Sequence, residues 1–450
     1  MARVLCVDFG STYTKAALVD TDDGTLLATA AHPTTLASDL LDGYRAIRAS
    51  LAGERVDDVL ACSSAGGGLR LAVVGYEREV TAEAGHRVGL SAGARVVHVA
   101  TGELLADDVA DLRAARPDVV LLVGGTDGGN SEVLRHNARR LGIGRVPVPV
   151  VVAGNVDGRD DAVHELVSRG RRVVVTANVL PRIGVLDPEP ARAAIREVFI
   201  RHVIGGQGLS RGTALGRMLR AATPDVVLSG VEVLADGAAG VPGAGEVVVV
   251  DVGGATTDVY SALTPTGEDA SLRKDVVQTM WRARTVEGDL GMRWNATGVV
   301  EAAVAEGLLD PARVEALGAH AARVAQDPAF VAAGPDDVAG DTELARLAVT
   351  AALRRHGRPT GPASEPRRLG DVQLVVGSGG MLRHGDDALR ARVLAAATSD
   401  HGGGWRVPRA AALAVDHRYV LFAAGLLARE APHAAAVLAT TGLHPVPAAS

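Results

Sequence analysis

Aromatic residues, cysteines and lysines are all scarce in this 450-residue sequence. Phe, Trp and Tyr together make up 3% of the chain, so its core must be built from Val, Leu and Ala, which suits strands buried between helices. Cys6 and Cys62 lie in apolar runs without metal-type spacing, which indicates buried thiols in a reducing compartment. No apolar run reaches the roughly 18 residues that a membrane span needs, and Asp8 interrupts the first one. We therefore expect a cytoplasmic protein without a membrane partner.

Positive charge is also limited. The formal net charge is −7, and the basic residues form neither a stripe nor a pattern interleaved with aromatics, which argues against a nucleic-acid partner. Of 46 basic residues only two are lysines, Lys15 and Lys274. An ammonium is a compact point charge and a guanidinium a wide fork, so the two are not interchangeable. Lys15 lies inside the first motif of the chain, either by chance or because a tight site there accepts only an ammonium.

What the chain does have is a series of short Val-rich runs, each followed by a Gly or Asn turn. They include RVLCVDFG, DVLACSSAGGG, DVVLLVGGTDGGN, PVVVAGN, RRVVVTANVLP, EVVVVDVGG and VQLVVGSGG. Continuous apolar strands that alternate with helical stretches are typical of parallel sheets covered by helices, so we predict an α/β fold. At 450 residues the chain is too long for one ordinary core, and two lobes are expected.

A connector rich in Gly, Ala and Pro over residues 234–246 gives the main boundary between these lobes. It predicts a first lobe over residues 1–240 and a second over 241–410. Residues 411–430 are interpreted as the last helix, which we expect to return towards the first lobe. Residues 431–450 are expected to be a loose tail.

Three of the turns share features that suit a nucleotide. The segments VLCVDFGSTYTK (4–15) and VVVVDVGGATTD (247–258) have one layout: four apolar residues, Asp, one residue, Gly, then small and hydroxyl residues. LVVGSGGML (374–382) adds a third glycine-rich turn after a strand. If these turns had no common function, a similar glycine-rich turn after a strand would have arisen by coincidence three times in one chain. The rival G-x-x-x-x-G-K-[ST] motif, and a complete G-x-G-x-x-G after a strand, are both absent from the sequence.

The chemistry of nucleotide binding explains each residue type in these turns. Glycines let backbone N–H groups approach a phosphate without interference from a Cβ, and hydroxyls add donors to its oxygens. Mg²⁺ prefers oxygen ligands and takes one or two carboxylates, which Asp8 and Asp251 would supply at facing turns. Lys15 would offset charge on the terminal phosphates, and the GSGG turn would let backbone lie against the ribose and the α-phosphate. ATP with Mg²⁺ is therefore the expected ligand.

The three turns resemble the phosphate-1, phosphate-2 and adenosine motifs of the superfamily that contains actin, hexokinase and the heat-shock chaperone ATPases. The resemblance implies two ribonuclease H-like lobes with a nucleotide cleft between them, where Asp8 and Asp251 hold the metal and act in catalysis with Lys15. The residues matching the phosphate-1 motif are Asp8, Gly10, Ser11, Thr12 and Lys15. Those matching the phosphate-2 motif are Asp251, Gly253, Gly254, Thr256, Thr257 and Asp258, and those matching the adenosine motif are Gly377, Ser378, Gly379 and Gly380.

A narrower resemblance covers nearly the whole chain. Long runs in order, among them DFGSTYTK, CSSAGGGLRLAVVG, LLVGGTDGGN, EPARAAIREVFIRHV, VVVDVGGATTDVYS, RTVEGDLGMR and YVLFAAGLLA, are similar to those of the glutamate mutase (methylaspartate mutase) accessory protein family, of MutL/GlmL type. The family implies an ATPase chaperone that reactivates an adenosylcobalamin-dependent mutase. Mg–ATP binding and hydrolysis would be coupled to mutase binding and to release of damaged cobalamin. CSSAGGG departs from the expected ASSAAGG only by small residues.

Two polar segments have more than one interpretation. Asp127 in GGTDGGN (124–130) either positions the attacking water as a catalytic residue, as the superfamily suggests, or belongs to an ordinary Asp-Gly turn. The run RTVEGDLGMRWN (284–295) gathers charged residues around two glycines. It would contact the ribose or the partner mutase, or it is merely a charged loop.

Other functions are possible on the same fold. A small-molecule kinase would need a substrate pocket and a carboxylate base, for which Asp127 or Asp258 could serve. An actin-like filament protein would need self-complementary surface insertions, for which the sequence offers no candidate. A hydantoin or oxoproline hydrolase shares an Asp-x-Gly-Gly motif, but the GSTYTK segment fits that function poorly.

Overall fold

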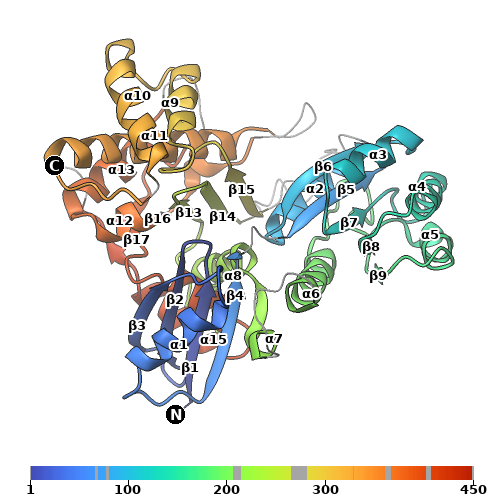
Figure 1. The fold of residues 1–450 in the computed structure, drawn as a ribbon, viewed down its shortest axis with the longest axis horizontal. Helices are drawn as coiled ribbons and strands as arrows, with labels where there is room; N and C mark the ends of the chain where they lie inside the picture. Colours follow the sequence, from blue (N-terminus) through green and yellow to red (C-terminus); the bar gives the residue numbers. More distant parts are fainter. Residues whose placement is uncertain are drawn as a thin grey trace.

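The computed structural model describes residues 2–65, 69–77, 81–205, 214–264, 281–327, 329–359, 366–401 and 407–447. Figure 1 shows them as three bodies, each built around one large sheet. Lys274 lies outside these ranges. No helix among the described residues is long and apolar enough to cross a membrane.

The first sheet has the strand order β10-β4-β1-β2-β3. β1 (Arg3–Phe9), β2 (Tyr13–Asp20) and β3 (Leu26–Pro33) pair antiparallel, while β4 (Asp58–Ser63) and β10 (Leu219–Ala222) run parallel to β1. Both faces of β1 are buried, which explains its unbroken apolar run. Leu5 and Val7 face one core cluster, and Val4 and Cys6 face another. α1 (Leu40–Ser50) packs against β3 on the first of these faces.

The second sheet repeats this plan in the order β15-β14-β13-β16-β17-β18. β13 (Val247–Val252), β14 (Thr257–Ala262) and β15 (Arg282–Glu287) are antiparallel, and β16 (Leu374–Ser378) and β17 (Ala412–Val415) continue parallel to β13. Its helices are α9 (Ala296–Ala305), α10 (Pro311–Gln326), α11 (Pro335–Gly357), α12 (Gly380–His384) and α13 (Asp387–Ser399). Two sheets with the same order and the same strand directions confirm the predicted two-lobed, actin-like α/β architecture.

The third sheet is inserted into the first lobe between β4 and β10 and is fully parallel, in the order β6-β5-β7-β8-β9. We call residues 70–205 the inserted domain. Its strands are β5 (Arg70–Gly75), β6 (Arg95–Thr101), β7 (Val119–Leu122), β8 (Val150–Val152) and β9 (Val173–Val175). α2 (Glu83–Ser91) and α6 (Glu189–Gly205) cover one face, and α3 (Ala106–Ala114), α4 (Glu132–Ile143) and α5 (Val156–Val167) cover the other. The sequence reading placed these strands in the first lobe without recognising a separate sheet.

Two helices connect the lobes. α8 (Thr223–Asp236) and α14 (Leu421–Leu427) share one core cluster with residues of β1 and β13. They cross at two glycines with almost no space between their backbones. A Cβ on Gly425 would lie 1.9 Å from the Val226 carbonyl oxygen, and one on Gly230 would lie 2.0 Å from that of Leu421.

The C-terminal region differs from the expectation in two ways. Residues 411–430 do not form one helix, because Ala412–Val415 is the strand β17 and α14 begins only at Leu421. The predicted loose tail over 431–450 is also wrong for its described part. Pro432–Thr441 forms α15, whose alanines are buried against α8 and α14, and β18 (His444–Pro445) pairs with β17. Small side chains let α15 pack closely although it has no large apolar residue apart from Leu438.

The helix crossing predicts a sharp sensitivity at Gly425. Gly425→Ala should lower the unfolding free energy by about 2 kcal/mol or more, because the added methyl group must push apart two helix backbones. Gly318→Ala in α10 is the matched control, since a Cβ there meets no atom within 4 Å and alanine favours a helix. Thermal unfolding of both variants checks this, and equal midpoints would contradict the tight crossing.

Candidate functional site

Asp8 lies near the end of β1 and is 1% exposed. Its Oδ1 accepts hydrogen bonds from the Thr223 hydroxyl at 2.5 Å and the Cys62 thiol at 3.6 Å, and its Oδ2 accepts one from the Tyr419 hydroxyl at 3.3 Å. Burial raises the pKa of Asp8, while the nearby Lys15 and these hydrogen bonds oppose the rise. The predicted phosphate-1 carboxylate is therefore a buried acid held by neutral donors from three other segments of the chain.

The turn between β1 and β2 presents Gly10, Ser11 and Thr12 at the surface. Gly10 is required by its surroundings, because a Cβ there would lie 2.6 Å from the Tyr13 carbonyl oxygen. The Thr34 hydroxyl donates to the Gly10 carbonyl at 2.7 Å, and the Thr34 amide donates to Thr12. The turn is thereby fixed from β3, and the hydroxyls of Ser11 and Thr12 are exposed.

Asp251 occupies the equivalent position on β13 and is partly exposed. Burial raises the pKa of Asp251, and the negative charges of Asp258 and Asp8 add to the rise. The positive charge of Lys15 and a hydrogen bond from Ser378 oppose it. Asp258 is its register partner on β14, just as Lys15 is the partner of Asp8 on β2. The two lobes and the adenosine turn therefore bring Asp8, Lys15, Asp251, Asp258 and Ser378 within electrostatic reach of one another.

The phosphate-2 turn is held by the segment 288–295. The Met292 amide donates to Gly253 at 3.0 Å, and the amides of Arg293 and Trp294 donate to Gly254 at 2.8 and 3.0 Å. Asn295 Nδ2 donates to the Ala255 carbonyl at 2.9 Å. This segment therefore buttresses the turn, a role that neither the ribose nor the charged-loop interpretation had included.

Thr256 and Thr257 point in different directions. The Thr256 hydroxyl donates to Asp258 at 3.0 Å on the partly exposed side of the turn. The Thr257 side chain is fully buried, and its hydroxyl donates to the Leu290 carbonyl at 2.6 Å. The expectation that Thr257 contacts a phosphate is wrong, because the alternation along β14 turns it into the core.

The adenosine turn lies directly against the end of β13. A Cβ on Gly379 would lie 2.1 Å from the Val252 carbonyl oxygen, and its φ of +105° is open only to glycine. Gly377 does not reach the surface as predicted, since it packs against Leu382 and Leu394 in the core. Gly379 and the exposed Gly380 are the parts of this turn available to a ligand.

Asp127 is not brought together with these turns. It follows β7, at the carboxyl edge of the inserted sheet, where its Oδ1 accepts hydrogen bonds from Asn178 Nδ2 at 2.8 Å and the Val156 amide at 3.0 Å. The second lobe contacts the opposite edge, because α2 runs back from the carboxyl edge and its Leu90 carbonyl accepts from Arg284 at 3.3 Å. The contacts of Asp127 are those of a residue that fastens neighbouring loops, in agreement with the Asp-Gly turn interpretation.

Four residues at the site were not predicted: Thr223, Arg383, Asp416 and Tyr419. A fifth, Arg284, begins the run 284–295 whose role the sequence left open. Arg284 is 8% exposed and pairs with Asp258 at 2.6 Å while it also reaches Leu90 of the inserted domain. The Tyr419 ring lies 3.6 Å from Lys15 Nζ and 5.3 Å from the Arg383 guanidinium carbon. In a chain with only five tyrosines, the buried Tyr419 was a signal that the sequence did offer.

The residues present fit a magnesium–nucleotide site. Asp8 is buried and Asp251 is partly buried, and neither forms an ion pair among the described residues; a charge removed from water is normally paired or bound to a metal. No group of three or more His, Cys, Asp or Glu side chains suited to a metal is found in the described part of the chain. Mg²⁺ does not need one, since it keeps several waters and takes one or two carboxylates beside phosphate oxygens.

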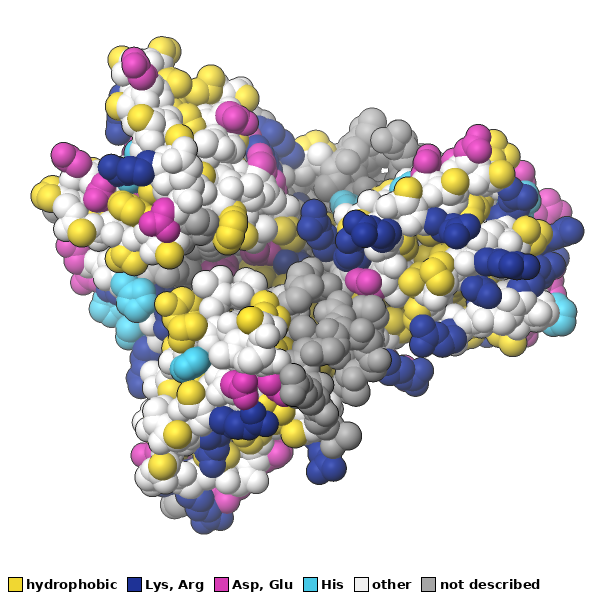
Figure 2. All heavy atoms as spheres, in the orientation of Figure 1, with side chains coloured by type: hydrophobic (Ala, Val, Ile, Leu, Met, Phe, Trp, Pro, Cys, Tyr) yellow, Lys and Arg dark blue, Asp and Glu magenta, His cyan; other side chains and the backbone are white. Residues whose placement is uncertain are grey.

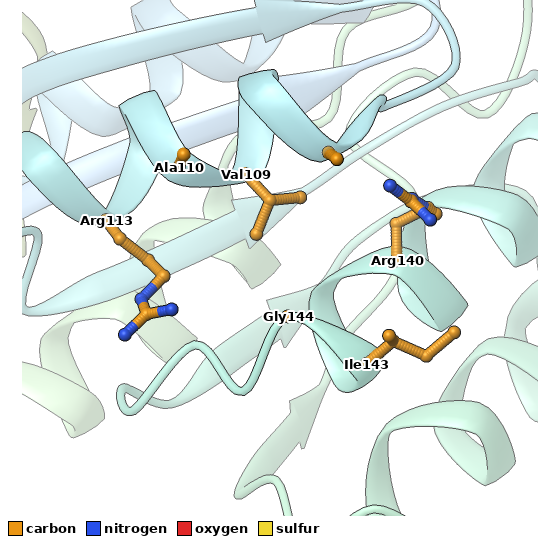
Figure 3. A pocket seen from close by; sticks show the side chains of 7 residues that line it. Val109, Ala110, Arg113, Arg140, Ile143 and Gly144 are labelled. Carbon is orange, nitrogen blue, oxygen red and sulfur yellow. The ribbon is translucent and has the colours of Figure 1, made fainter.

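A separate hollow lies on the inserted domain, between α3 and α4. It has a volume of about 280 Å³, and Figure 3 shows Val109 between Arg113 and Arg140 at its wall. Its lining is Ala106, Val109, Ala110, Arg113, Arg140, Ile143 and Gly144, none of which belongs to the three turns. Figure 2 shows basic side chains, all of them arginines in this part of the molecule, spread over its visible face.

Two comparisons of the sequence with known proteins show its family. The family model described as "MutL protein" matches residues 4–443. The curated "Protein MutL" of Clostridium tetanomorphum is 35% identical over 455 residues, which cover 96% of this chain and 97% of that protein. Among solved structures, a nucleotide-free acetone carboxylase is 17% identical with a TM-score of 0.37, covering 94% of this chain and 70% of its own. Xylulose kinase from Bifidobacterium adolescentis is 12% identical with a TM-score of 0.33, covering 100% and 95%.

Asp416 lies beside the site, and its titration should make the folding stability of the protein depend on pH. Burial raises the pKa of Asp416 to about 6, with Arg383 lowering it and Asp251 raising it, while its oxygens accept from the Val420 and Leu421 amides. Because the folded pKa exceeds the unfolded value, this group favours folding at low pH, and the contribution is lost as pH rises through about 6. The loss amounts to about 3 kcal/mol.

Asp416→Asn should remove this dependence. The thermal midpoint of the variant should rise relative to that of the wild type as pH increases from 4 to 7, on the order of a few degrees. A constant offset between the two proteins over this range would mean that Asp416 does not titrate there.

Proposed function

Because this chain belongs to the MutL protein family, we propose that it is an ATP-dependent reactivating accessory protein for an adenosylcobalamin-dependent glutamate mutase. Binding and hydrolysis of Mg–ATP between the lobes would change the affinity for the mutase, so that damaged cobalamin is released. The observation that supports this most directly is the convergence of turns from both lobes on Asp8, Lys15 and Asp251. A reducing, cytoplasmic setting fits the two cysteines, which are buried free thiols.

The residues of the site would divide the work as follows. Asp8 and Asp251 would hold the metal, and Lys15 would face the terminal phosphates. The backbone of Gly10–Thr12 and Gly253–Thr256 would cradle phosphate oxygens, and Gly379 and Gly380 would lie against the nucleoside. When bound, Mg²⁺ would neutralise charge on the phosphates and on the two carboxylates, and catalysis would rest on positioning and charge neutralisation.

The connections of the site suggest how occupancy would reach a partner. Thr223, which donates to Asp8, is the first residue of α8, and Tyr419, which also donates to Asp8, lies just before α14. Both helices of the crossing therefore begin beside one carboxylate. To change the ratio of two conformations from 1:99 to 99:1, a ligand must bind one of them about 5.5 kcal/mol more tightly than the other. Any ligand-driven closure of the lobes would have to meet this requirement.

The inserted domain is tied to both lobes. Asp225 on α8 is 1% exposed and pairs with Arg192 at 3.1 Å and Arg196 at 2.6 Å, both on α6 of the inserted domain. On the other side, Arg284 of the second lobe joins Asp258 to the Leu90 carbonyl of α2. The inserted domain is thus placed to move when the lobes move.

A small-molecule kinase is the second candidate. It would need a free carboxylate base beside the terminal phosphate. Asp258 is engaged by Arg284 and Thr256, and Asp127 lies on the far edge of another sheet. These contacts favour the accessory ATPase over the kinase.

Replacing the metal carboxylate tests the nucleotide site. Asp8→Asn should reduce Mg–ATP hydrolysis at least 100-fold, because the shape of the side chain and the hydrogen bonds accepted by Oδ1 persist while its charge is lost. The thermal midpoint should not fall, since a buried carboxylate with a raised pKa is replaced by a neutral group. Asp107→Asn, at an exposed position on α3, is the control. Full hydrolysis by Asp8→Asn would rule out the assigned site.

The proposed partner can be tested by adding it to the hydrolysis assay. Purified protein with Mg–ATP should hydrolyse faster in the presence of inactivated glutamate mutase that carries damaged cobalamin. Cobalamin exchange should then depend on ATP. If the rate of ATP hydrolysis does not change with the mutase but rises when a metabolite bearing a hydroxyl group is added, the result would favour the kinase instead.

A further inference from the structure

Asp8 and Lys15 are direct neighbours that do not form an ion pair. They are register partners on the antiparallel strands β1 and β2, a geometry that brings Cβ atoms within about 5.5 Å of each other. Opposite charges in such positions normally join. Among the ion pairs of the described residues, however, none connects Lys15 with Asp8. Something in the site holds the two charges apart.

Tyr419 contacts both of them. Its ring lies 3.6 Å beneath Lys15 Nζ, at cation–π distance, and its hydroxyl donates to Asp8 Oδ2 at 3.3 Å. The ring gives the ammonium a partner other than a carboxylate. The hydroxyl occupies one oxygen of Asp8, while Thr223 and Cys62 donate to the other. Each charged group thus has neutral groups as its direct contacts in place of the other.

The backbone at Tyr419 is strained, and the surrounding contacts maintain the strain. Its φ is +55°, a region that a bulky residue other than glycine rarely adopts. The Tyr419 amide donates to the Asp416 carbonyl, and the Asp416 carboxylate accepts from the amides of the next two residues. Strain of this kind persists only where the surrounding structure over-determines the conformation. Here it turns the side chain towards Asp8 and Lys15.

We propose that Tyr419 is a positioning residue that prevents Asp8 and Lys15 from neutralising each other, so that the carboxylate is available to a divalent cation and the ammonium to phosphate. The inference rests on the proposed Mg–ATP site and adds to it a residue from the connection between the lobes. Arg383 of α12, just after the adenosine turn, lies over the same ring at 5.3 Å. Tyr419 therefore contacts groups from the first turn and a group next to the third.

The test measures how much Mg²⁺ strengthens nucleotide binding. Calorimetric titration of the whole protein with a non-hydrolysable ATP analogue, with and without Mg²⁺, gives this enhancement for each variant. Tyr419→Phe keeps the ring and should retain the enhancement within about threefold. Tyr419→Leu loses ring and hydroxyl, lets Lys15 join Asp8, and should lose at least tenfold. Because Asn tolerates a positive φ, Tyr419→Asn replaces Tyr419→Leu if the latter does not fold.

A double variant separates positioning from a general structural role. In a Lys15→Met background there is no ammonium to capture Asp8, so Tyr419→Leu should reduce the Mg²⁺ enhancement by less than threefold. A full effect of Tyr419→Leu in that background, or wild-type enhancement in Tyr419→Leu alone, would overturn the inference. If the wild type itself shows no Mg²⁺-dependent binding, the proposed function fails and the inference fails with it.

Discussion

The contact between Gly230 and Gly425 is the constraint on which the rest of the molecule depends. Two helices from distant parts of the chain meet there with backbone against backbone, and no side chain fills the crossing. Each helix also packs on a sheet, so the crossing is the place where the cores of the two lobes become one cluster. Because a backbone contact cannot be compressed, the two helices cannot approach each other more closely at this point.

The proposed nucleotide site is connected to this helix crossing. The residues that hold Asp8 from outside its own sheet are the first residue of α8 and the residue next to α14. A carboxylate that gains or loses a cation changes the hydrogen bonds it accepts, and both helices of the crossing begin with such a bond. The inserted domain is connected to the same site at two places, through the ion pairs of the buried Asp225 and through the contacts of Arg284. Charge at the turns and the placement of a third sheet are thus physically connected.

Much of the site could be predicted from the sequence because its chemistry is local. Asp8, Gly10, Asp251, Gly253 and Gly379 each lie in a strand–turn unit of about ten residues, and their spacing carries the signal. Thr257 could have been excluded by the same means. Strand alternation places it on the face of Val259, inside the second core, although the motif resemblance alone treats all hydroxyls alike.

The remaining errors concern pairing between distant segments. The central strands of the inserted domain, β5, β7 and β8, are apolar and buried on both faces like those of the lobes, so nothing in their pattern says that they form a separate sheet. Tyr419 donates to a residue 411 positions earlier, and Thr223 to one 215 positions earlier. Contacts at such separations leave no periodicity in the sequence. Asp127 was placed near the cleft for the same reason, since its strand is assigned to a sheet only by its neighbours.

The dependence of β1 on α14 has a consequence for how the molecule is made. The face of β1 that carries Val4 and Cys6 is covered by Phe422 and Leu426, and the Cys6 thiol reaches the Ala423 carbonyl across 417 positions at 3.9 Å. During synthesis, β1 leaves the ribosome long before α14 does, and this face of β1 stays uncovered until α14 has followed. Its apolar surface is exposed to aggregation over that interval. Asp8 also lacks its Tyr419 donor until then, so a chain interrupted before residue 419 cannot assemble the site, and only molecules finished to that point acquire it.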